Sequence, residues 1–93
     1  FDTAYTDKLT IQTTDFIKFG KMCYFCIQFI VNEAITDDYG FRPITLPFKS
    51  IARTWINNGT QYLINGNSNQ IMVNGSAIAK GNYMFTGFYF TDE

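Results

Sequence analysis

The 93-residue sequence contains no histidine and only one tryptophan, two cysteines and two prolines. Without histidine it lacks the commonest metal ligand and the usual general base near neutral pH. Lys and Arg number 7 against 8 Asp and Glu, so we expect no basic surface and no nucleic-acid partner. No apolar run approaches the roughly 20 residues of a membrane-spanning helix, so we expect no membrane insertion.

The sequence also lacks the residue spacings of common catalytic and cofactor sites. It has no glycine-rich phosphate loop, no zinc-ligand spacing and no Ser-His-Asp set. Glu33, Asp37 and Asp38 form an acidic cluster in one stretch, whereas a paired-carboxylate hydrolase needs acids on two sides of its sugar. We interpret the cluster as a solvated loop, with Ca²⁺ or ligand contact and catalysis as alternatives. We therefore predict no cofactor, no metal and no enzymatic activity.

The chain is rich in aromatic residues, at 18%, and its longest apolar run covers residues 22–31. That run holds no Gly, Pro or charge, and its aromatic and β-branched residues favour a strand. With period two, one face is wholly apolar and the other is mixed, which predicts a central strand with one face in a core. Cys23 and Cys26 would then point to opposite faces, too far apart for a disulfide. Two buried thiols are predicted, with redox or metal roles as alternatives.

Alternating polar and apolar residues predict further strands on both sides of this run. On its N-terminal side, two short strands and a turn at Gly20-Lys21 predict a hairpin with residues 22–31. On its C-terminal side, Asn-Gly pairs at 58–59, 65–66 and 74–75 predict type I′ turns in a meander. The predicted strands are 9–13, 15–19, 51–57, 60–64, 70–73, 76–79 and 82–90.

Three other stretches complete the organisation predicted from the sequence. Residues 32–40 have the composition of a loop, and Pro43 and Pro47 favour an edge or crossover segment at 41–48. The last strand is aromatic on both faces, so we expect it to be covered on both sides and to pair with residues 22–31. Its aromatic surplus fits either core filling or packing against identical copies.

Together these elements predict an all-β fold with antiparallel strands. About seven or eight short strands, without a predicted helix, favour a β-sandwich or barrel of the jelly-roll or Greek-key type. We expect residues 1–93 to form a single domain, with 1–8 as a lead-in. Because the chain starts at Phe1 rather than Met, we expect it to be a fragment of a longer protein or a processed product.

The candidate binding residues are Trp55, Arg53, Asn57 and Tyr62. A saccharide site needs a flat aromatic ring for the apolar face of a sugar and planar polar groups for its hydroxyls. In a strand at 51–57, Arg53, Trp55 and Asn57 would share one face. We predict ligand binding by these four residues, while a core or interface position for Trp55 stays open.

The order of segments resembles that of a known family. Phe19-Gly20-Lys21-Met22 forms a turn into an apolar strand, the proline-bearing stretch 41–48 and the Asn-Gly meander follow, and the chain closes on Gly87-Phe88-Tyr89-Phe90. Over roughly residues 15–90 this is similar to the C-terminal head domain of lactococcal-type phage receptor-binding proteins at the tail tip.

The resemblance implies a function as well as a fold. Such heads are β-barrels or jelly rolls, form homotrimers on the virion at the phage tail or baseplate, and bind cell-wall saccharides of Gram-positive hosts without cleaving them. Family sites commonly combine Trp with Asp, His and Arg, to which Trp55 and Arg53 correspond, whereas histidine is missing here. The alternative is a purely structural fibre or baseplate module that contacts only other virion proteins.

Overall fold

The computed structural model describes residues 5–57 and 59–93, and within these it contains nine strands and no helix. Half of the predicted lead-in, residues 1–4, and the first residue of the predicted Asn58-Gly59 turn lie outside the described residues. The strands are β1 (Leu9–Phe19), β2 (Met22–Val31), β3 (Ile35–Thr36), β4 (Ile44–Ser50), β5 (Thr54–Trp55), β6 (Tyr62–Ile64), β7 (Ser68–Val73), β8 (Ala77–Ile78) and β9 (Gly81–Phe90).

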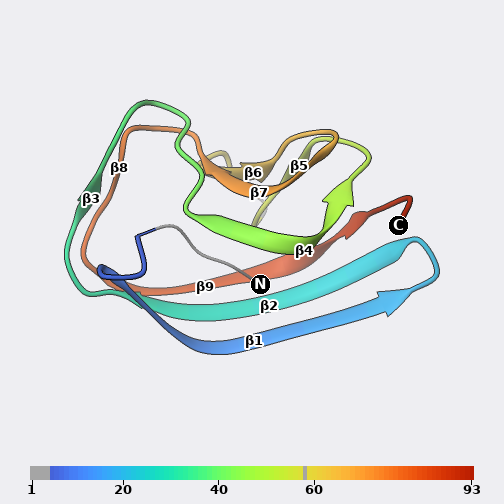
Figure 1. Ribbon diagram of the computed structural model, residues 1–93, viewed down its shortest axis with the longest axis horizontal. Helices are drawn as coiled ribbons and strands as arrows, with labels where there is room; N and C mark the ends of the chain where they lie inside the picture. Colours follow the sequence, from blue (N-terminus) through green and yellow to red (C-terminus); the bar gives the residue numbers. More distant parts are fainter. Residues whose placement is uncertain (1–4, 58) are drawn as a thin grey trace.

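The strands form two larger sheets that lie against each other, with a small sheet at one end (Figure 1). The long layer has the order β1-β2-β9, the second layer has the order β4-β7-β6-β5, and β3 pairs with β8. Every pairing is antiparallel. The predicted all-β, antiparallel fold is therefore confirmed and is consistent with a β-sandwich, while a jelly-roll or Greek-key connection stays a prediction.

β2 is the central strand of the long layer, as predicted, and it pairs with β1 on one side and β9 on the other. Its side chains alternate between a buried inner face and a partly covered outer face. Burial of each large inner side chain contributes roughly 1.5–3 kcal/mol to folding. Both thiols are free, as predicted, but only Cys23 is buried. Cys26 is half-buried, so the prediction of two buried thiols is wrong for Cys26, which lies on the partly covered outer face. The inner residues of β2 are Cys23, Phe25, Ile27, Phe29 and Val31.

The structure corrects the predicted turns of the meander. Positive φ values are absent from Asn65, Gly66, Asn74 and Gly75 among the described residues, so type I′ turns at these pairs are wrong. β6 and β7 still form a hairpin, because a three-residue loop ends at Asn67 with a φ of 61°. β7 and β8 do not pair, because β8 crosses to β3.

Several predicted strands also have different limits. The two strands predicted at 9–13 and 15–19 are one strand, β1, with a register shift between Ile11 and Thr13. Residues 51–57 form a strand only at Thr54–Trp55, and a short strand, β3, lies in the predicted loop 32–40. β4 contains Pro47 and is an edge strand, in agreement with the prediction for 41–48.

The last strand, β9, pairs with β2 as predicted, but the prediction that both its faces are covered is wrong. Phe85 and Tyr89 point into the core, whereas Met84, Phe88 and Phe90 on the opposite face are 50–53% exposed. The physical reason is that the sandwich has two layers, so only the inner face of the long sheet is covered. β9 is also one of the two edge strands of its sheet.

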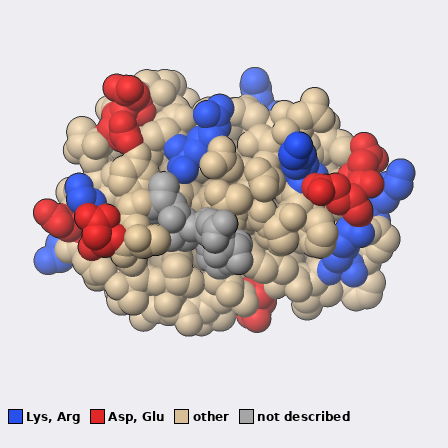
Figure 2. Space-filling view, in the orientation of Figure 1, with Lys and Arg blue, Asp and Glu red and all other residues tan. Residues whose placement is uncertain are grey.

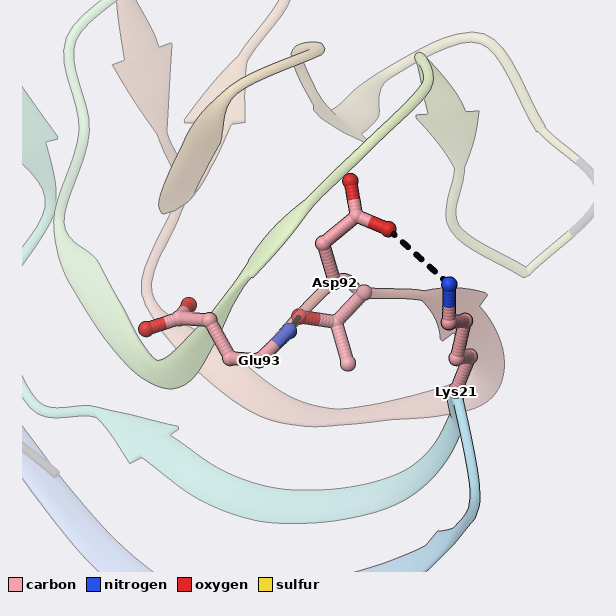
Figure 3. A network of polar contacts seen from close by, with 4 residues as sticks. Lys21, Asp92 and Glu93 are labelled. Atoms are coloured by element: carbon pink, nitrogen blue, oxygen red, sulfur yellow. Dashed lines mark hydrogen bonds and ion pairs between the residues drawn. The ribbon is translucent and has the colours of Figure 1, made fainter.

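The end of β9 is attached to the β1–β2 turn (Figure 3). The Thr91 N–H donates to the Lys21 carbonyl at 2.7 Å. Lys21 Nζ lies 3.6 Å from Asp92 Oδ1 in an exposed ion pair, which contributes at most about 1 kcal/mol. The Glu93 carboxylate accepts from the Lys49 N–H at 2.5 Å. These contacts fix the C-terminal half of β9 next to β4.

Candidate functional site

A groove of about 740 Å³ lies beside the free edge of β9. One wall is residues 86–90 of β9, and the other is the segment 52–55 together with Asn57. This volume is within the roughly 300–1,000 Å³ that is common for small-molecule sites. The groove is therefore the candidate site.

The β9 wall of the groove presents main-chain polar groups. In an edge strand, alternate residues turn both their N–H and C=O away from the sheet. The Thr86 N–H donates to Asn57 Oδ1 at 3.1 Å, and the Phe90 carbonyl accepts from the Ile51 N–H at 2.9 Å, so even-numbered residues face outward. Phe88 lies between them, and its N–H and C=O have no hydrogen-bond partner among the described residues.

Asn57 holds the opposite wall against β9. Its Nδ2 donates to the Met84 carbonyl at 2.9 Å while its Oδ1 accepts from the Thr86 N–H, so one side chain takes the place of a neighbouring strand. Its φ of 59° is left-handed, a conformation that Asn tolerates better than most residues. Asn57 thus lines the groove as predicted, but both ends of its amide are already engaged, which makes it a positioning residue.

Trp55 and Arg53 lie on the same wall of the groove. β5 pairs with β6, with Trp55 opposite Leu63, and the indole is 41% exposed. A core position for Trp55 is therefore wrong. Arg53 is exposed, and it supplies the charge among the described residues that line the groove. The structure brings Trp55, Arg53 and Asn57 together, while ligand binding by them stays a prediction.

Tyr62, the fourth predicted binding residue, lies elsewhere. It is half-buried and its ring centroid is 4.6 Å from that of Phe85 in the core. Burial raises the pKa of the Tyr62 hydroxyl above its ordinary value, and the neighbouring Tyr83 raises it further. Tyr62 lines a separate hollow of about 300 Å³ between β6, β7 and β8. The structure therefore separates Tyr62 from the groove.

The aromatic surplus of the last strand allowed for packing against identical copies, but the sequence did not show which residues would form such a surface. We call the surface that the structure shows the outer-face patch. It consists of neighbouring side chains on the uncovered face of the long sheet: Ile17, Phe19, Met22, Tyr24, Phe88 and Phe90. The strand register places Phe19, Met22 and Phe90 in one row. Ile17, Tyr24 and Phe88 form the next row. Phe88 and Phe90 also line the groove, so the two features are continuous.

The acidic cluster predicted from the sequence does not line the groove. Glu33, Asp37 and Asp38 are exposed, and Asp37 Oδ1 accepts from the Asp38 N–H at 2.7 Å. Figure 2 shows acidic and basic side chains interspersed on the face in view.

Within residues 5–57 and 59–93 no group of three His, Cys, Asp or Glu is placed to hold a metal ion. The same residues contain no helix of the length and hydropathy needed to cross a membrane.

Comparisons with known proteins found no match to this chain. No protein-family model fits the sequence, and neither curated proteins nor solved structures match it. The likeness to phage receptor-binding heads therefore stays a prediction.

Proposed function

We propose that this protein is a non-catalytic saccharide-recognition module, working as a receptor-binding head on the tail or baseplate of a phage virion. The observation that carries the proposal is the groove, which is lined by the exposed Trp55 on one wall and by the edge strand β9 on the other. An aromatic ring can stack on the apolar face of a sugar, while unpaired N–H and C=O groups can bond its hydroxyls.

The shape of the groove favours a sugar over an extended peptide. A peptide that adds to a sheet edge needs a continuous row of free main-chain groups. Here the free stretch of β9 is closed at one end by Asn57 and at the other by the Ile51–Phe90 hydrogen bond. A compact ring fits between these two contacts, whereas a peptide strand of ordinary length would break one of them.

The lining of the groove also supports binding without cleavage. A glycosidase of the usual kind places two carboxyl groups across the scissile bond. The described residues that line the groove include no Asp or Glu. Saccharide cleavage there would lack its usual acid and base, so binding alone is the proposed activity.

The proposed ligand is a cell-wall saccharide of a Gram-positive host, and the proposed assembly is a homotrimer. Both follow from the resemblance of the segment order to phage receptor-binding heads. The outer-face patch supports assembly, because an apolar sheet face of this kind commonly marks a protein interface. Isothermal calorimetry would test binding of cell-wall polysaccharide extracted from Gram-positive bacteria, and light scattering at micromolar concentration would test assembly.

Trp55→Ala tests the proposed site. We expect it to weaken binding of the best oligosaccharide on an array, or of the extracted polysaccharide, by about five- to tenfold. A stacked aromatic ring contributes roughly 1–1.4 kcal/mol, which corresponds to that change in affinity. Tyr39→Ala is the matched control, because Tyr39 is 72% exposed and does not line the groove. Binding that is unchanged in Trp55→Ala would refute the site, and wild-type protein that binds no saccharide would refute the function.

A second candidate function is a structural module that contacts only other virion proteins. The outer-face patch is the observation that favours it, since five of its six side chains are 40–70% exposed. This function predicts a large apolar contact with another chain and no affinity for saccharides. Phe19→Ser, at the most exposed position of the patch, would then abolish association while saccharide binding remained undetectable in both proteins.

A further inference from the structure

We infer that the main chain of Phe88 hydrogen-bonds two adjacent hydroxyl groups of the bound sugar. The groove would thus recognise a ring with neighbouring hydroxyls through backbone atoms rather than through polar side chains. This inference rests on the proposed saccharide function and identifies the atoms of the site that contact the ligand.

The argument begins with the geometry of an edge strand. An outward-facing strand residue presents its N–H and its C=O on the same side, where a partner strand would bond both. For Phe88 that position is open, because among the described residues the opposite segment hydrogen-bonds to the edge of β9 only through Ile51 and Asn57. One donor and one acceptor side by side match two adjacent hydroxyls, of which one accepts the N–H and the other donates to the C=O.

The neighbouring groups on the edge explain why Phe88 is the central position. The Thr86 N–H and the Phe90 C=O are each occupied within the fold, which leaves Thr86 C=O, the two groups of Phe88 and Phe90 N–H along the groove. Phe88 lies at the middle of these and faces the wall that carries Trp55. A ring stacked on the indole would therefore place its hydroxyl rim toward Phe88.

The side chain of Phe88 has a different role from its main chain. Register with Tyr24 places the phenyl ring on the outer face of the sheet, where it is 53% exposed. It lies 6.0 Å from the ring of Phe90 in an edge-to-face arrangement. A substitution that replaces only the phenyl ring leaves the main-chain N–H and C=O of Phe88 in place. Mutation can therefore separate the contribution of the ring to binding from that of the main chain.

Phe88→Pro removes the N–H, and Phe88→Leu is its matched control. Proline is tolerated in edge strands where the N–H faces away from the sheet, as it does here. With the tightest-binding trisaccharide from an array of hexose, deoxyhexose and N-acetylhexosamine oligomers, we expect Phe88→Pro to weaken binding about tenfold. Phe88→Leu changes only the ring and keeps the N–H, so it should bind several-fold more tightly than Phe88→Pro, by about the value of one hydrogen bond. Equal affinity in a folded Phe88→Pro protein would overturn the inference.

Amide NMR on the wild-type protein gives a test that needs no variant. Titration with the same trisaccharide should shift the backbone amide resonances of Phe88 and Phe90, and a monodeoxy analogue that lacks one of the two hydroxyls should shift Phe88 less. If the Trp55 indole resonance moves while the Phe88 amide stays still, the backbone inference is wrong and the saccharide function stands. If no array member binds, the function and the inference fall together.

Discussion

Asn57 offers a quantitative test of how the groove wall is held. Its side chain donates to Met84 C=O at 2.9 Å and accepts from Thr86 N–H at 3.1 Å, at a residue with a φ of 59°. Asn57→Gly removes both hydrogen bonds but keeps the left-handed conformation available. Each bond contributes about 0.5–1.5 kcal/mol, and both are exposed, so we expect a loss of about 1.5 kcal/mol in unfolding free energy.

Asn67→Gly is the matched control for this variant. Asn67 has nearly the same φ, 61°, and its side chain makes no hydrogen bond with the described residues. Glycine adds the same unfolded-chain entropy at either position, so the difference between the two variants isolates the two hydrogen bonds. We expect Asn67→Gly to lie within about 0.5 kcal/mol of wild type.

Thermal unfolding monitored by circular dichroism measures both variants. For a domain of this size, about 1.5 kcal/mol corresponds to a fall in Tm of roughly 6–12 °C. Asn57→Gly should also weaken saccharide binding, because the wall that carries Trp55 loses one of its two attachments to β9. Equal Tm values for Asn57→Gly and Asn67→Gly would refute the role assigned to Asn57.

Three further predictions concern the core. Burial, together with contact from the Cys23 thiol, raises the pKa of Tyr89. The hydroxyl of Tyr89 therefore ionises at a lower pH in the unfolded chain than in the folded protein, so the free energy of unfolding should fall above pH 10 by up to about 1.4 kcal/mol per pH unit. Urea unfolding at pH 9–11 should show a smaller fall for Tyr89→Phe than for wild type. Cys23→Ser should lower the free energy of unfolding by about 1–3 kcal/mol, since it buries a hydroxyl group. Cys26→Ser should change it by less than about 0.5 kcal/mol in the same urea assay. A larger loss for Cys26→Ser than for Cys23→Ser would contradict the alternation of inner and outer residues in β2. Gly87→Ala should lower Tm by several degrees, because Gly87 has a φ of 154°, which alanine adopts only with strain. Gly66 has no positive φ, so Gly66→Ala should leave Tm nearly unchanged. Similar Tm values for the two variants would count against backbone strain at Gly87.

The sequence predicted the main strands of the fold better than the connections between them. Period-two alternation and the absence of Gly, Pro and charge identified residues 22–31 with the observed limits of β2. The antiparallel partner β9 followed from the same kind of pattern. Such patterns report which side chains are buried, and they act over a few neighbouring residues, so they predict strands more reliably than connections.

The turns were harder to predict because Asn-Gly pairs also suit other loops. At 65–67 the positive φ falls on Asn67, one residue beyond the Asn-Gly pair, because a three-residue loop matches the β6–β7 register. After Asn74-Gly75 the next strand, β8, pairs with β3 and not with β7. No local sequence feature distinguishes this connection from a hairpin turn. Tertiary pairing decides both cases.

The candidate site was predicted in part. Arg53, Trp55 and Asn57 line one wall of the groove, but Ala52 and Thr54 line it too, so their common position does not test the predicted alternation. Only Thr54–Trp55 forms a strand in this segment. The other wall consists of main-chain groups, which the identity of Phe88 does not reveal. Tyr62 was misplaced because its sequence distance from Trp55 says nothing of its packing against Phe85.

The attachment of the groove wall at its two ends has a consequence for how this surface could diverge between relatives. Residues 52–55 are exposed or half-buried, and none belongs to the hydrophobic core. Substitutions and short insertions there would reshape the contact surface while Ile51 and Asn57 preserve its anchorage. The scaffold and the surface of the groove can therefore evolve as separate units.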